Sequence, residues 1–460
     1  MSLRTDASLP MRRREQRAWY WYDWANSAYA TTVGTVLFAP YLTSVAETAA
    51  CGAPGTAQHP CTTDLHPLGL LAVSPGSLVF YVVTLATVVS ALVLPVVGAA
   101  ADRSAHKRRI LGGFAWAGSL AAALMFLVTG GDWQLGTVLL FVANICLASS
   151  LVVYDALLCE VATPDERDRV SSRGWALGYL GGGLLLAVNL AVVTLHDSLG
   201  LSTAMAVRLS LLSAAVWWAG FTLVPYLGLR DRPPVAVVPE QGGLVRQSFG
   251  QLLTTLRDLR LYPVTMTFLL AYLFYNDGIQ TVISAASVYG EKQLGFGTST
   301  LIGTILMVQF VAFFGALLFG RAAQRFGSRR VILVGLGVWL AVVAAAYFLP
   351  RGRLVGFLVL AVGIGLVLGG TQALSRSFFS LLIPRGREAE YFSLYQACER
   401  GTSWLGTLVF GLVHQWTNSY RPAILALATF FLIGFVLLSR VDLARGAREA
   451  GEAAPVAALD

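Results

Sequence analysis

Long runs of apolar residues, separated by short polar segments, fill almost the whole of this chain. A helix needs about 20 apolar residues to cross the ~30 Å hydrocarbon core of a bilayer. Twelve stretches of the sequence reach about that length or exceed it, so the pattern predicts an all-α membrane protein with twelve transmembrane helices. The predicted spans are residues 18–46, 76–101, 109–129, 134–158, 173–196, 203–229, 261–289, 299–323, 329–349, 354–383, 390–416 and 420–440.

The sequence contains an internal repeat. Residues 22–33 return in altered form as residues 272–283, and residues 98–111 return as residues 320–333. Duplicated halves with polar groups at bilayer depth are typical of alternating-access transporters. The aligned positions include Tyr22 with Tyr272, Asn26 with Asn276, Thr31 with Thr281, and Pro164 with Pro384.

The repeat predicts two pseudo-symmetric six-helix bundles joined by a polar linker. The linker contains three prolines and one segment, near residues 244–259, that could form an amphipathic helix. The expected divisions are an N-terminal bundle at 1–229, a cytoplasmic linker at 230–260, a C-terminal bundle at 261–441 and a cytoplasmic tail at 442–460.

Composition and charge place these helices in lipid. Hydrophobic residues make up 56% of the chain and charged residues only 13%, and the mean hydropathy is +0.66. The formal net charge is +8, but most Lys and Arg residues lie in alternate loops, which the positive-inside rule explains without any nucleic acid partner. We therefore expect a multi-pass protein of the cytoplasmic membrane with both termini inside. Trp19, Tyr20 and Trp21 are expected to form an aromatic belt at the interface.

Two kinds of motif carry a resemblance to a known family. The loop after the second span has Gly98, Asp102 and a pair of Arg residues, and a related loop follows the eighth span. Over essentially its whole length the chain resembles the major facilitator superfamily. Within it, residues 22–29, 174–182 and 369–377 look like the branch related to the fungal vacuole effluxer, an autophagy-associated amino-acid exporter. The resemblance implies the major facilitator fold and a permease or exporter of small solutes. The chain departs from the branch at Asp155 and Cys159, where the branch tends to have Asn and Pro.

Ionisable residues inside the predicted spans are the strongest candidates for function. Asp23, Asp155, Asp277 and Arg376 lie on the first, fourth, seventh and tenth spans, which line the central cavity of the resembled fold. A charge in hydrocarbon is unfavourable unless it has a partner, a wet cavity or a function. From the number of residues to the span ends, Asp155 and Arg376 lie at similar depth, so we expect a charge pair across the two halves.

Three carboxylates are predicted to take part in ion coupling. Asp277 lies near mid-bilayer, where it could bind and release a proton or a cation as the cavity opens to either side. The alternative is a hydrogen bond to Asn276 or Gln280 that only holds helices together. The other two candidates are Asp23, which could instead tether the cytoplasmic gate near Arg17, and Glu399, which projects about 100° away from Arg400 and cannot face the cavity together with it.

The predicted substrate site is centred on Arg376. A guanidinium group can hold a carboxylate or phosphate by two parallel hydrogen bonds. The alternative for Arg376 is a plain salt bridge to Asp155. Neutral polar and aromatic groups suited to a small polar or zwitterionic solute complete the predicted set, which is Asn26, Tyr29, Asp155, Asn276, Gln280, Gln372, Arg376 and Trp404.

The loop from Asp102 to Arg109 is a candidate gate. The resemblance implies that Asp102 meets the N-terminus of a neighbouring helix. It also implies that the Arg residues pair across the halves when the cytoplasmic side is shut, so that these contacts set the balance between conformations. The alternative is a purely topogenic basic loop. The predicted gating residues are Asp102, Arg103, Arg108, Arg109, Arg325 and Arg329.

Cys51 and Cys61 share the first predicted outside loop and are expected to form a disulfide. The alternative is a metal site that would also use His59, Asp64 and His66, but their spacing matches no recognised zinc pattern. We expect no metal and no other cofactor.

The leading functional hypothesis is a monomeric secondary transporter that moves a small polar solute, such as an amino acid or peptide, together with H+ or Na+. An exporter or flippase of an amphipathic compound or lipid is the alternative. A membrane enzyme is a weaker one, because the five His residues are dispersed and form no catalytic group. No nucleotide-binding Gly-Lys-Ser/Thr loop is present, so ATP is not expected to drive the cycle.

Overall fold

The protein is helical throughout the residues that the computed structural model describes. The described residues are 9–55, 61–67, 72–234, 259–401 and 403–451. Within them the only β pairing is a single bridge between Leu65 and Val73. The all-helical prediction is therefore confirmed for these residues. Most of the predicted linker, including the amphipathic helix expected near residues 244–259, lies outside them.

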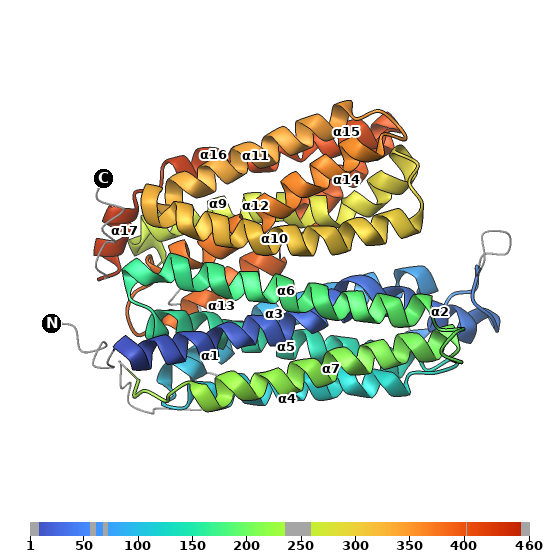
Figure 1. Ribbon diagram of the computed structural model, residues 1–460, viewed down its shortest axis with the longest axis horizontal. Helices are drawn as coiled ribbons and strands as arrows, with labels where there is room; N and C mark the ends of the chain where they lie inside the picture. Colours follow the sequence, from blue (N-terminus) through green and yellow to red (C-terminus); the bar gives the residue numbers. More distant parts are fainter. Residues whose placement is uncertain (1–8, 56–60, 68–71, 235–258, 402, 452–460) are drawn as a thin grey trace.

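The helices that precede the linker form one bundle (Figure 1). Its first helical segment continues from α1 through the π-helical turns of η1 into α2, and α7 leads towards the linker. The helices of this first bundle are α1 (Leu9–Ala28), η1 (Tyr29–Leu37), α2 (Phe38–Cys51), α3 (Leu78–Arg103), α4 (Lys107–Leu124), α5 (Trp133–Val161), α6 (Arg167–Thr194) and α7 (Thr203–Gly228).

The helices that follow the linker form a second bundle above the first in Figure 1. The stretch predicted as the eleventh span comprises two helices, α13 and α14, and α15 and α16 occupy the twelfth. The longer elements of this part are α9 (Pro263–Val288), α10 (Thr298–Phe326), α11 (Ser328–Phe348), α12 (Leu354–Ser380), α13 (Glu388–Gly401), α14 (Ser403–Thr417), α15 (Tyr420–Ala426), α16 (Ala428–Ser439) and α17 (Leu443–Glu449).

Nine helical segments of the described residues are long and apolar enough to cross a membrane. They correspond to nine of the twelve predicted spans, and the other three spans are helical but more polar. These three contain α1, α9 and the pair α13 and α14, and they carry Asp23, Asp277 and Glu399. Asp155 and Arg376, by contrast, lie on two of the nine apolar helices, α5 and α12. The count of twelve transmembrane helices stays a prediction.

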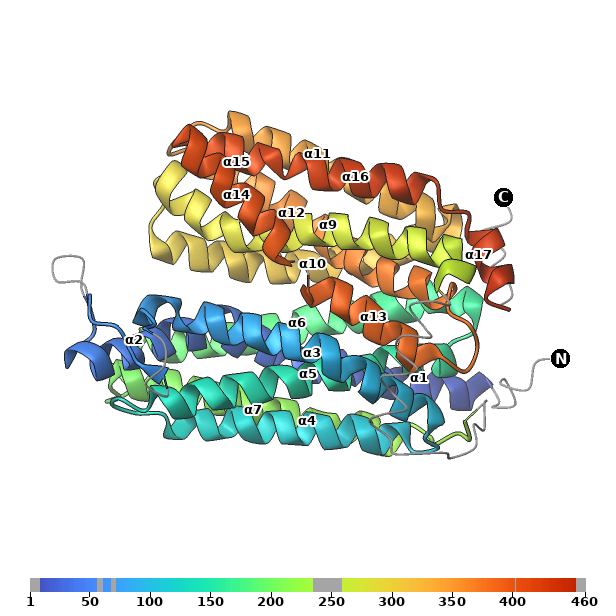
Figure 2. The same ribbon diagram turned by 180° about the vertical axis from the view of Figure 1, so that it is seen from behind.

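The two bundles meet mainly along α3, α5 and α6 of the first. α6 packs against α10 and α12, and α3 packs against α13 (Figures 1 and 2). α13 also contacts α5. The helix α13 follows α12 in the chain, yet it is seated largely on the first bundle, so it lies at the boundary between the two.

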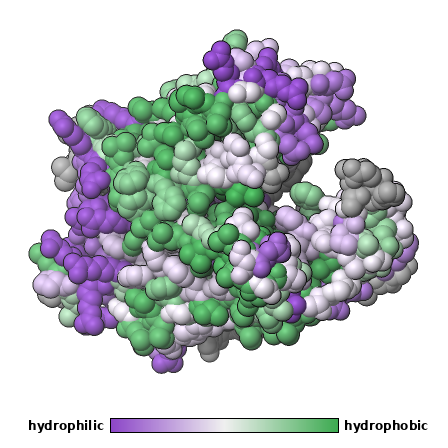
Figure 3. Space-filling model, turned by 45° about the vertical axis from the view of Figure 1, so that its right-hand side comes forward, coloured by the Kyte–Doolittle hydropathy of each residue, from purple (hydrophilic) through white to green (hydrophobic). Residues whose placement is uncertain are grey.

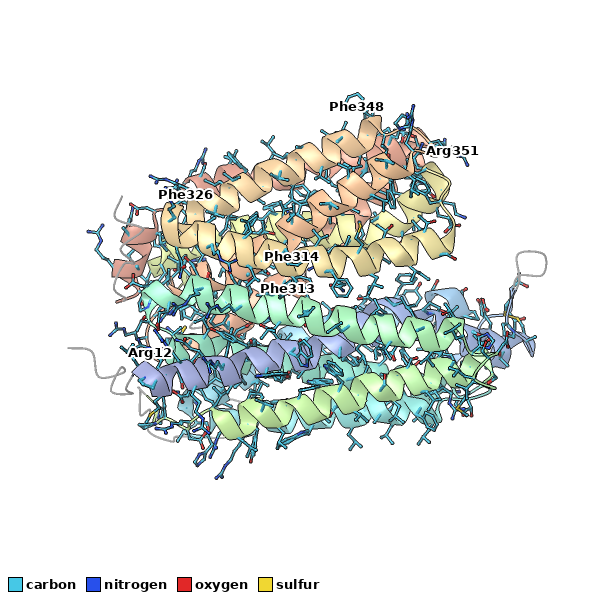
Figure 4. All side chains as sticks on the ribbon, viewed as in Figure 1. Arg12, Phe313, Phe314, Phe326, Phe348 and Arg351 are labelled. Carbon is cyan, nitrogen blue, oxygen red and sulfur yellow. A yellow bond between two sulfur atoms is a disulfide. The ribbon has the colours of Figure 1, made fainter. Side chains whose placement is uncertain are left out.

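The two ends of the molecule differ. α1 begins and α17 ends at the same end, which Arg12 marks in Figure 4, and Arg351 marks the opposite end. Figure 3 brings the opposite end forward and shows the surface notched between the two bundles. The sides are broadly apolar in the same view, and Phe80 and Val355 are 73% and 76% exposed. An exposed apolar surface of this extent suits contact with lipid rather than water.

Candidate functional site

Arg376 of α12 forms ion pairs with two carboxylates of the first bundle. Its Nη2 lies 3.0 Å from Asp23 Oδ2 on α1, and its Nη1 lies 3.3 Å from Asp155 Oδ1 on α5. All three side chains are buried, with exposed fractions of 2% for Arg376, 6% for Asp23 and 1% for Asp155. The expected pair of Asp155 with Arg376 is present, and Asp23 joins it.

The guanidinium group of Arg376 is fully engaged. Its Nε donates to Ser171 Oγ at 2.9 Å, its Nη2 donates to the Ser171 carbonyl at 3.1 Å, and Nη1 also donates to Asp23 Oδ1 at 3.4 Å. Together with the two ion pairs these contacts use the five N–H groups of the side chain. In this conformation Arg376 has no donor left for a substrate carboxylate, so the geometry favours the salt-bridge alternative.

Aromatic rings surround this ion cluster. The Cζ of Arg376 lies 4.8 Å from the ring centre of Trp19 and 5.3 Å from that of Tyr154, and the Tyr154 hydroxyl donates to Asp23 Oδ2 at 2.7 Å. Trp19 is completely buried and stacks on Tyr154. The expectation that Trp19 belongs to an interfacial belt is therefore wrong, because its ring shields a buried charge.

Asp155 connects the ion cluster to α13. Gln396 on α13 donates from Nε2 to Asp155 Oδ2 at 2.8 Å, and Arg400 donates to Gln396 Oε1 at 3.5 Å. Two carboxylates face one guanidinium, so the cluster of Asp23, Asp155 and Arg376 carries one excess negative charge when both acids are ionised. The amide of Gln396 compensates part of it by hydrogen bonding.

A second polar group, which we call the amide cluster, lies inside the second bundle. Asn276 Oδ1 accepts from Gln372 Nε2 at 2.8 Å and from Gln280 Nε2 at 3.5 Å, and Gln372 Oε1 accepts from the Tyr272 hydroxyl at 3.4 Å. Asn276 Nδ2 donates to the carbonyl of Glu399 on α13 at 3.1 Å. The structure thus brings three of the predicted substrate-site residues together and links them to α13.

The other predicted substrate-site residues lie elsewhere. Asn26 donates from Nδ2 to the carbonyl of Tyr22 in its own helix at 2.6 Å. Tyr29 is buried against Trp218 of α7, 5.1 Å between ring centres, and its hydroxyl lacks a hydrogen-bond partner. Trp404 belongs to α14, but its side chain lies outside the described residues. Asn26 and Tyr29 therefore contact the first bundle rather than the amide cluster.

Asp277 has no cationic partner within the described part of the chain. It is fully buried, and its Oδ2 accepts from the backbone N–H of Gly406, in the first turns of α14, at 2.8 Å. Its Oδ1 has no hydrogen-bond partner. The alternative that Asp277 only bonds to Asn276 or Gln280 is wrong, because the carboxylate turns towards α14. Glu399, the third candidate for coupling, is only half-buried on α13.

The end of the molecule that holds Arg12 is closed by contacts between the bundles. Asp102 accepts from the backbone N–H groups of Ala389 and Glu390, at the start of α13, at 3.0 and 2.9 Å. This is the helix N-terminus contact that the family resemblance implies. Lys107 lies 3.4 Å from Asp102 and 2.8 Å from Glu160, so the buried acid has a cation beside it.

Three Arg residues of the predicted gate make different contacts from those expected. Arg108 pairs with Asp231 at 2.9 Å, and Arg329 donates to the carbonyl of Ser439, each beside its own bundle. Arg325 lies over the ring of the adjacent Phe326. The expectation that Arg108, Arg325 and Arg329 pair across the halves is therefore wrong for this conformation. Basic groups at exposed helix ends find local partners or water. Arg109 is exposed, and Arg103 ends α3.

Contacts across the halves come instead from residues at the start of α6 that the sequence analysis missed. Arg167 Nη1 donates to the carbonyl of Ser380 at 2.8 Å, and the hydroxyl of Ser377 donates to Asp168 Oδ1 at 2.6 Å. These residues follow Pro164 in a charged segment that reads as a topogenic loop. A signal was available, since Asp168 and Ser171 share a helical spacing with the glycines of residues 174–182.

Cys51 and Cys61 are joined by a disulfide, with Cα atoms 5.9 Å apart. Both sulfur atoms are therefore unavailable to a metal, and the alternative of a metal site that uses these two thiolates is wrong. The described residues contain no group of three or more His, Cys, Asp or Glu side chains placed to hold a metal ion.

Comparison with known proteins gives a consistent result. A family model described as "Vacuole effluxer Atg22 like" matches residues 11–167 and 160–451. The "Uncharacterized MFS-type transporter YxiO" of Bacillus subtilis is 32% identical over 432 residues, covering 93% of this chain and 95% of that protein. "Autophagy-related protein 22-1" of Penicillium rubens is 24% identical over 559 residues, covering 97% and 92%.

Solved structures share the fold at low sequence identity. A bacterial homologue of the iron transporter ferroportin, in an outward-facing state, has a TM-score of 0.65 and 14% identity, covering 94% of this chain and 98% of that one. The major facilitator superfamily proton:xylose symporter XylE has a TM-score of 0.67 and 10% identity, covering 94% and 96%. These similarities support the predicted major facilitator fold.

Proposed function

Because this chain belongs to the family of vacuole effluxer Atg22-like proteins, and is thus a major facilitator-type membrane transporter rather than an enzyme, we propose that it exports a small polar solute by ion-coupled alternating access. The substrate class follows from the amide cluster, whose amides and phenol can pair with the amino and carboxyl groups of an amino acid or a short peptide. The direction is supported by the word effluxer in the name of the matching family.

The observation that carries this proposal is the position of Arg376 between Asp23 and Asp155. The cation belongs to the second bundle and both acids belong to the first, so the bundles cannot separate at this depth without breaking the ion pairs. Breaking a buried ion pair without new partners is unfavourable by several kcal/mol. A solute or coupling ion that offers such partners would shift the balance towards the other conformation.

In the proposed cycle the structure represents the state closed at the end that holds Arg12. Asp102, Arg167, Asp168 and Arg376 contribute to that closure, and the opposite end is notched between the bundles (Figure 3). We assign the closed end to the cytoplasm, with both termini inside the cytoplasmic membrane, because Lys and Arg residues are enriched there. Each bundle moves as a unit in this scheme, and one monomer suffices.

The test is transport by the purified protein in sealed vesicles. Vesicles preloaded with an unlabelled mixture of amino acids and dipeptides are supplied with one labelled member at a time, with and without gradients of pH or Na+. Saturable counterflow that responds to one gradient is expected. A labelled phospholipid that crosses the bilayer while every polar solute stays outside would instead favour the exporter of amphipathic compounds, and would overturn the proposal.

A further inference from the structure

Two buried oxygen atoms without hydrogen-bond partners occur one helical turn apart on α9. Asp277 and Thr281 are 0% and 1% exposed, and neither Asp277 Oδ1 nor Thr281 Oγ1 has a hydrogen-bond partner among the residues that the structure describes. Residues four apart on a helix project from the same face. A buried polar group without a partner is unfavourable by roughly the value of a lost hydrogen bond, so two such groups on one face need an explanation.

Both side chains converge on Gly406 of α14. The backbone N–H of Gly406 donates to Asp277 Oδ2 at 2.8 Å, and a Cβ atom on Gly406 would collide with Thr281 Oγ1 and lie 3.1 Å from Thr281 Cβ. Only glycine allows α14 to approach α9 this closely. The carboxylate and the hydroxyl therefore both lie beside Gly406, and Phe430 and Phe431 of α16 pack at the adjacent Gly278.

We propose that Asp277 and Thr281 form a proton-binding site, and that the proton is the coupling ion of the transporter. This inference rests on the proposed transport function. When Asp277 is ionised, the Thr281 hydroxyl can donate to Oδ1. When Asp277 is protonated at Oδ1, the same hydroxyl can accept, because a hydroxyl group serves as donor or acceptor by rotation.

The surroundings favour a proton over a metal cation. Ca2+ and Mg2+ take six or more oxygen ligands, whereas the described side chains at this site offer two unpartnered oxygens, Asp277 Oδ1 and Thr281 Oγ1. The elements packed against α9 carry other charged or titratable groups, although α16 carries none. Together with those of α9 itself, they are Tyr272 and Tyr275 on α9, Arg376 on α12, Glu388, Glu390, Tyr391, Tyr395, Cys398, Glu399 and Arg400 on α13, His414 on α14, Tyr289, Glu291 and Lys292 on the short turn Tyr289–Gln293, Arg260 on the turn Leu259–Leu261, and Arg445, Arg448 and Glu449 on α17.

Protonation at this site would act on the boundary between the bundles. Asp102 of the first bundle holds the start of α13, and Asp277 of the second holds the start of α14. Neutralising Asp277 weakens the hydrogen bond that its Oδ2 accepts from the backbone N–H of Gly406. The proton would therefore loosen α14 from α9, next to the helix that is seated on the opposite bundle.

Infrared difference spectroscopy of the purified protein tests this assignment without any solute. A carboxylic acid gives a C=O stretch band only when it is protonated, so the band that belongs to Asp277 should grow as the pH is lowered. In the D277N variant this band should be lost completely. In T281V it should remain but shift to higher frequency, because the acid loses its hydrogen-bond acceptor.

The matched control is T267V, which removes a threonine hydroxyl from the exposed side of the same helix, where it bonds to the Pro263 carbonyl. It should leave the band in place. T281V should fold normally, since the hydroxyl that it removes has no partner to leave unsatisfied. T281S should restore the wild-type frequency.

Three results would count against the inference. A band that persists in D277N belongs to another acid and removes Asp277 from the site. Equal spectra for T281V and T267V remove Thr281. A band that disappears when choline is replaced by Na+ at constant pH identifies a sodium site instead. The wild-type protein could also show the expected bands and yet move no solute in vesicles. That result would contradict the transport proposal but not the proton-binding site.

Discussion

The first half of the chain packs η1, the continuation of α1, against α6, and the second half repeats this contact with α9 against α14. In the first, a Cβ atom on Gly182 would lie 2.6 Å from Thr31 Oγ1. In the second, a Cβ atom on Gly406 would collide with Thr281 Oγ1. Thr31 and Thr281 occupy the same place in the repeat. In both halves, therefore, a threonine side chain packs directly against a glycine of the neighbouring helix.

The two helices, α1 and α9, differ in whether their buried carboxylate has a cationic partner. Asp23 on α1 has an ion pair with Arg376 and a hydrogen bond from Tyr154. Asp277 on α9 has a single backbone N–H, that of Gly406, and no cation among the described residues. The charge of Asp23 is therefore compensated by a cation across the bundle interface. Asp277 instead keeps one carboxylate oxygen without a hydrogen-bond partner, inside its own bundle.

Neither acid has a counterpart in the other half. The repeat places Leu273 at the position of Asp23 and Ser27 at the position of Asp277. The two acids thus sit on equivalent helices, one turn apart in register, and each is specific to its half. The difference separates two tasks: Asp23 holds the bundles together through Arg376, whereas Asp277 is free to change its protonation.

The largest effect should follow from removing the shared cation. In R376M, Asp23 and Asp155 remain buried without a partner for their charge, so the free energy of unfolding should fall by about 3–5 kcal/mol. Counterflow should be abolished. Thermal unfolding of the purified protein in detergent and vesicle transport measure the two effects.

A matched variant separates charge from packing. The triple variant R376M/D23N/D155N removes the cation together with both acids, so stability should return while transport stays absent. If R376M unfolds at the wild-type temperature, the ion cluster does not hold the bundles together. Asp23 then has no structural role that distinguishes it from Asp277.

A smaller loss should follow from removing one of the two acids. In D23N the guanidinium of Arg376 keeps Asp155, so the expected cost is that of one charge-assisted hydrogen-bonded contact, about 1.5–3 kcal/mol. Thermal unfolding measured beside that of R376M checks the order. Equal losses for D23N and R376M would show that Asp155 contributes nothing to the cluster.

The sequence predicts the depth of a residue in the membrane better than the direction in which its side chain points. Counting residues from the span ends was enough to pair Asp155 with Arg376. The resemblance to a fold whose seventh and tenth spans line the cavity was enough to place Asn276 and Gln372 in one site. The partner of Asp23 was not found in this way. Most spans are apolar on all sides, so the pattern gives no rotational phase about the helix axis.

Two further features could not be predicted from the sequence, for related reasons. Trp19 reads as an interfacial residue because it lies near the end of a span, yet it covers the guanidinium of Arg376. Arg167 and Asp168 read as loop charges, yet Arg167 is buried and Asp168 half-buried between the bundles, and both bond to α12. Charged residues at the start of a helix can orient the helix in the membrane or bond across the bundle interface. Only the packing of the second bundle shows which of these two roles they have.

A third prediction concerns the balance between conformations. D102A removes the acceptor of two backbone N–H groups at the start of α13, and the loss of such a cap costs about 0.5–2 kcal/mol. Because the contact exists only when this end is closed, the equilibrium should shift towards the open state by roughly 2- to 30-fold.

The native Cys159 can report this shift, since it lies at the closed end beside the Ser380 carbonyl. With Cys146 and Cys398 replaced by Ser, a maleimide should label Cys159 several-fold faster in D102A than in the parent. D231N is the control, because Asp231 bonds to Arg108 without crossing the interface. Equal labelling of D102A and D231N would remove Asp102 from the gate.

The smallest effect on stability should come from D277N, and this makes it the sharpest test of the comparison. The amide oxygen of an Asn at this position can still accept from the Gly406 N–H, and no cation loses its partner. The free energy of unfolding should therefore stay within about 0.5 kcal/mol of the parent, or rise, because an uncompensated buried charge has been removed. Uphill transport should be lost while exchange is kept. A drop as large as that of D23N would mean that Asp277 has an ionic partner in the folded protein, and the two acids would then both be structural.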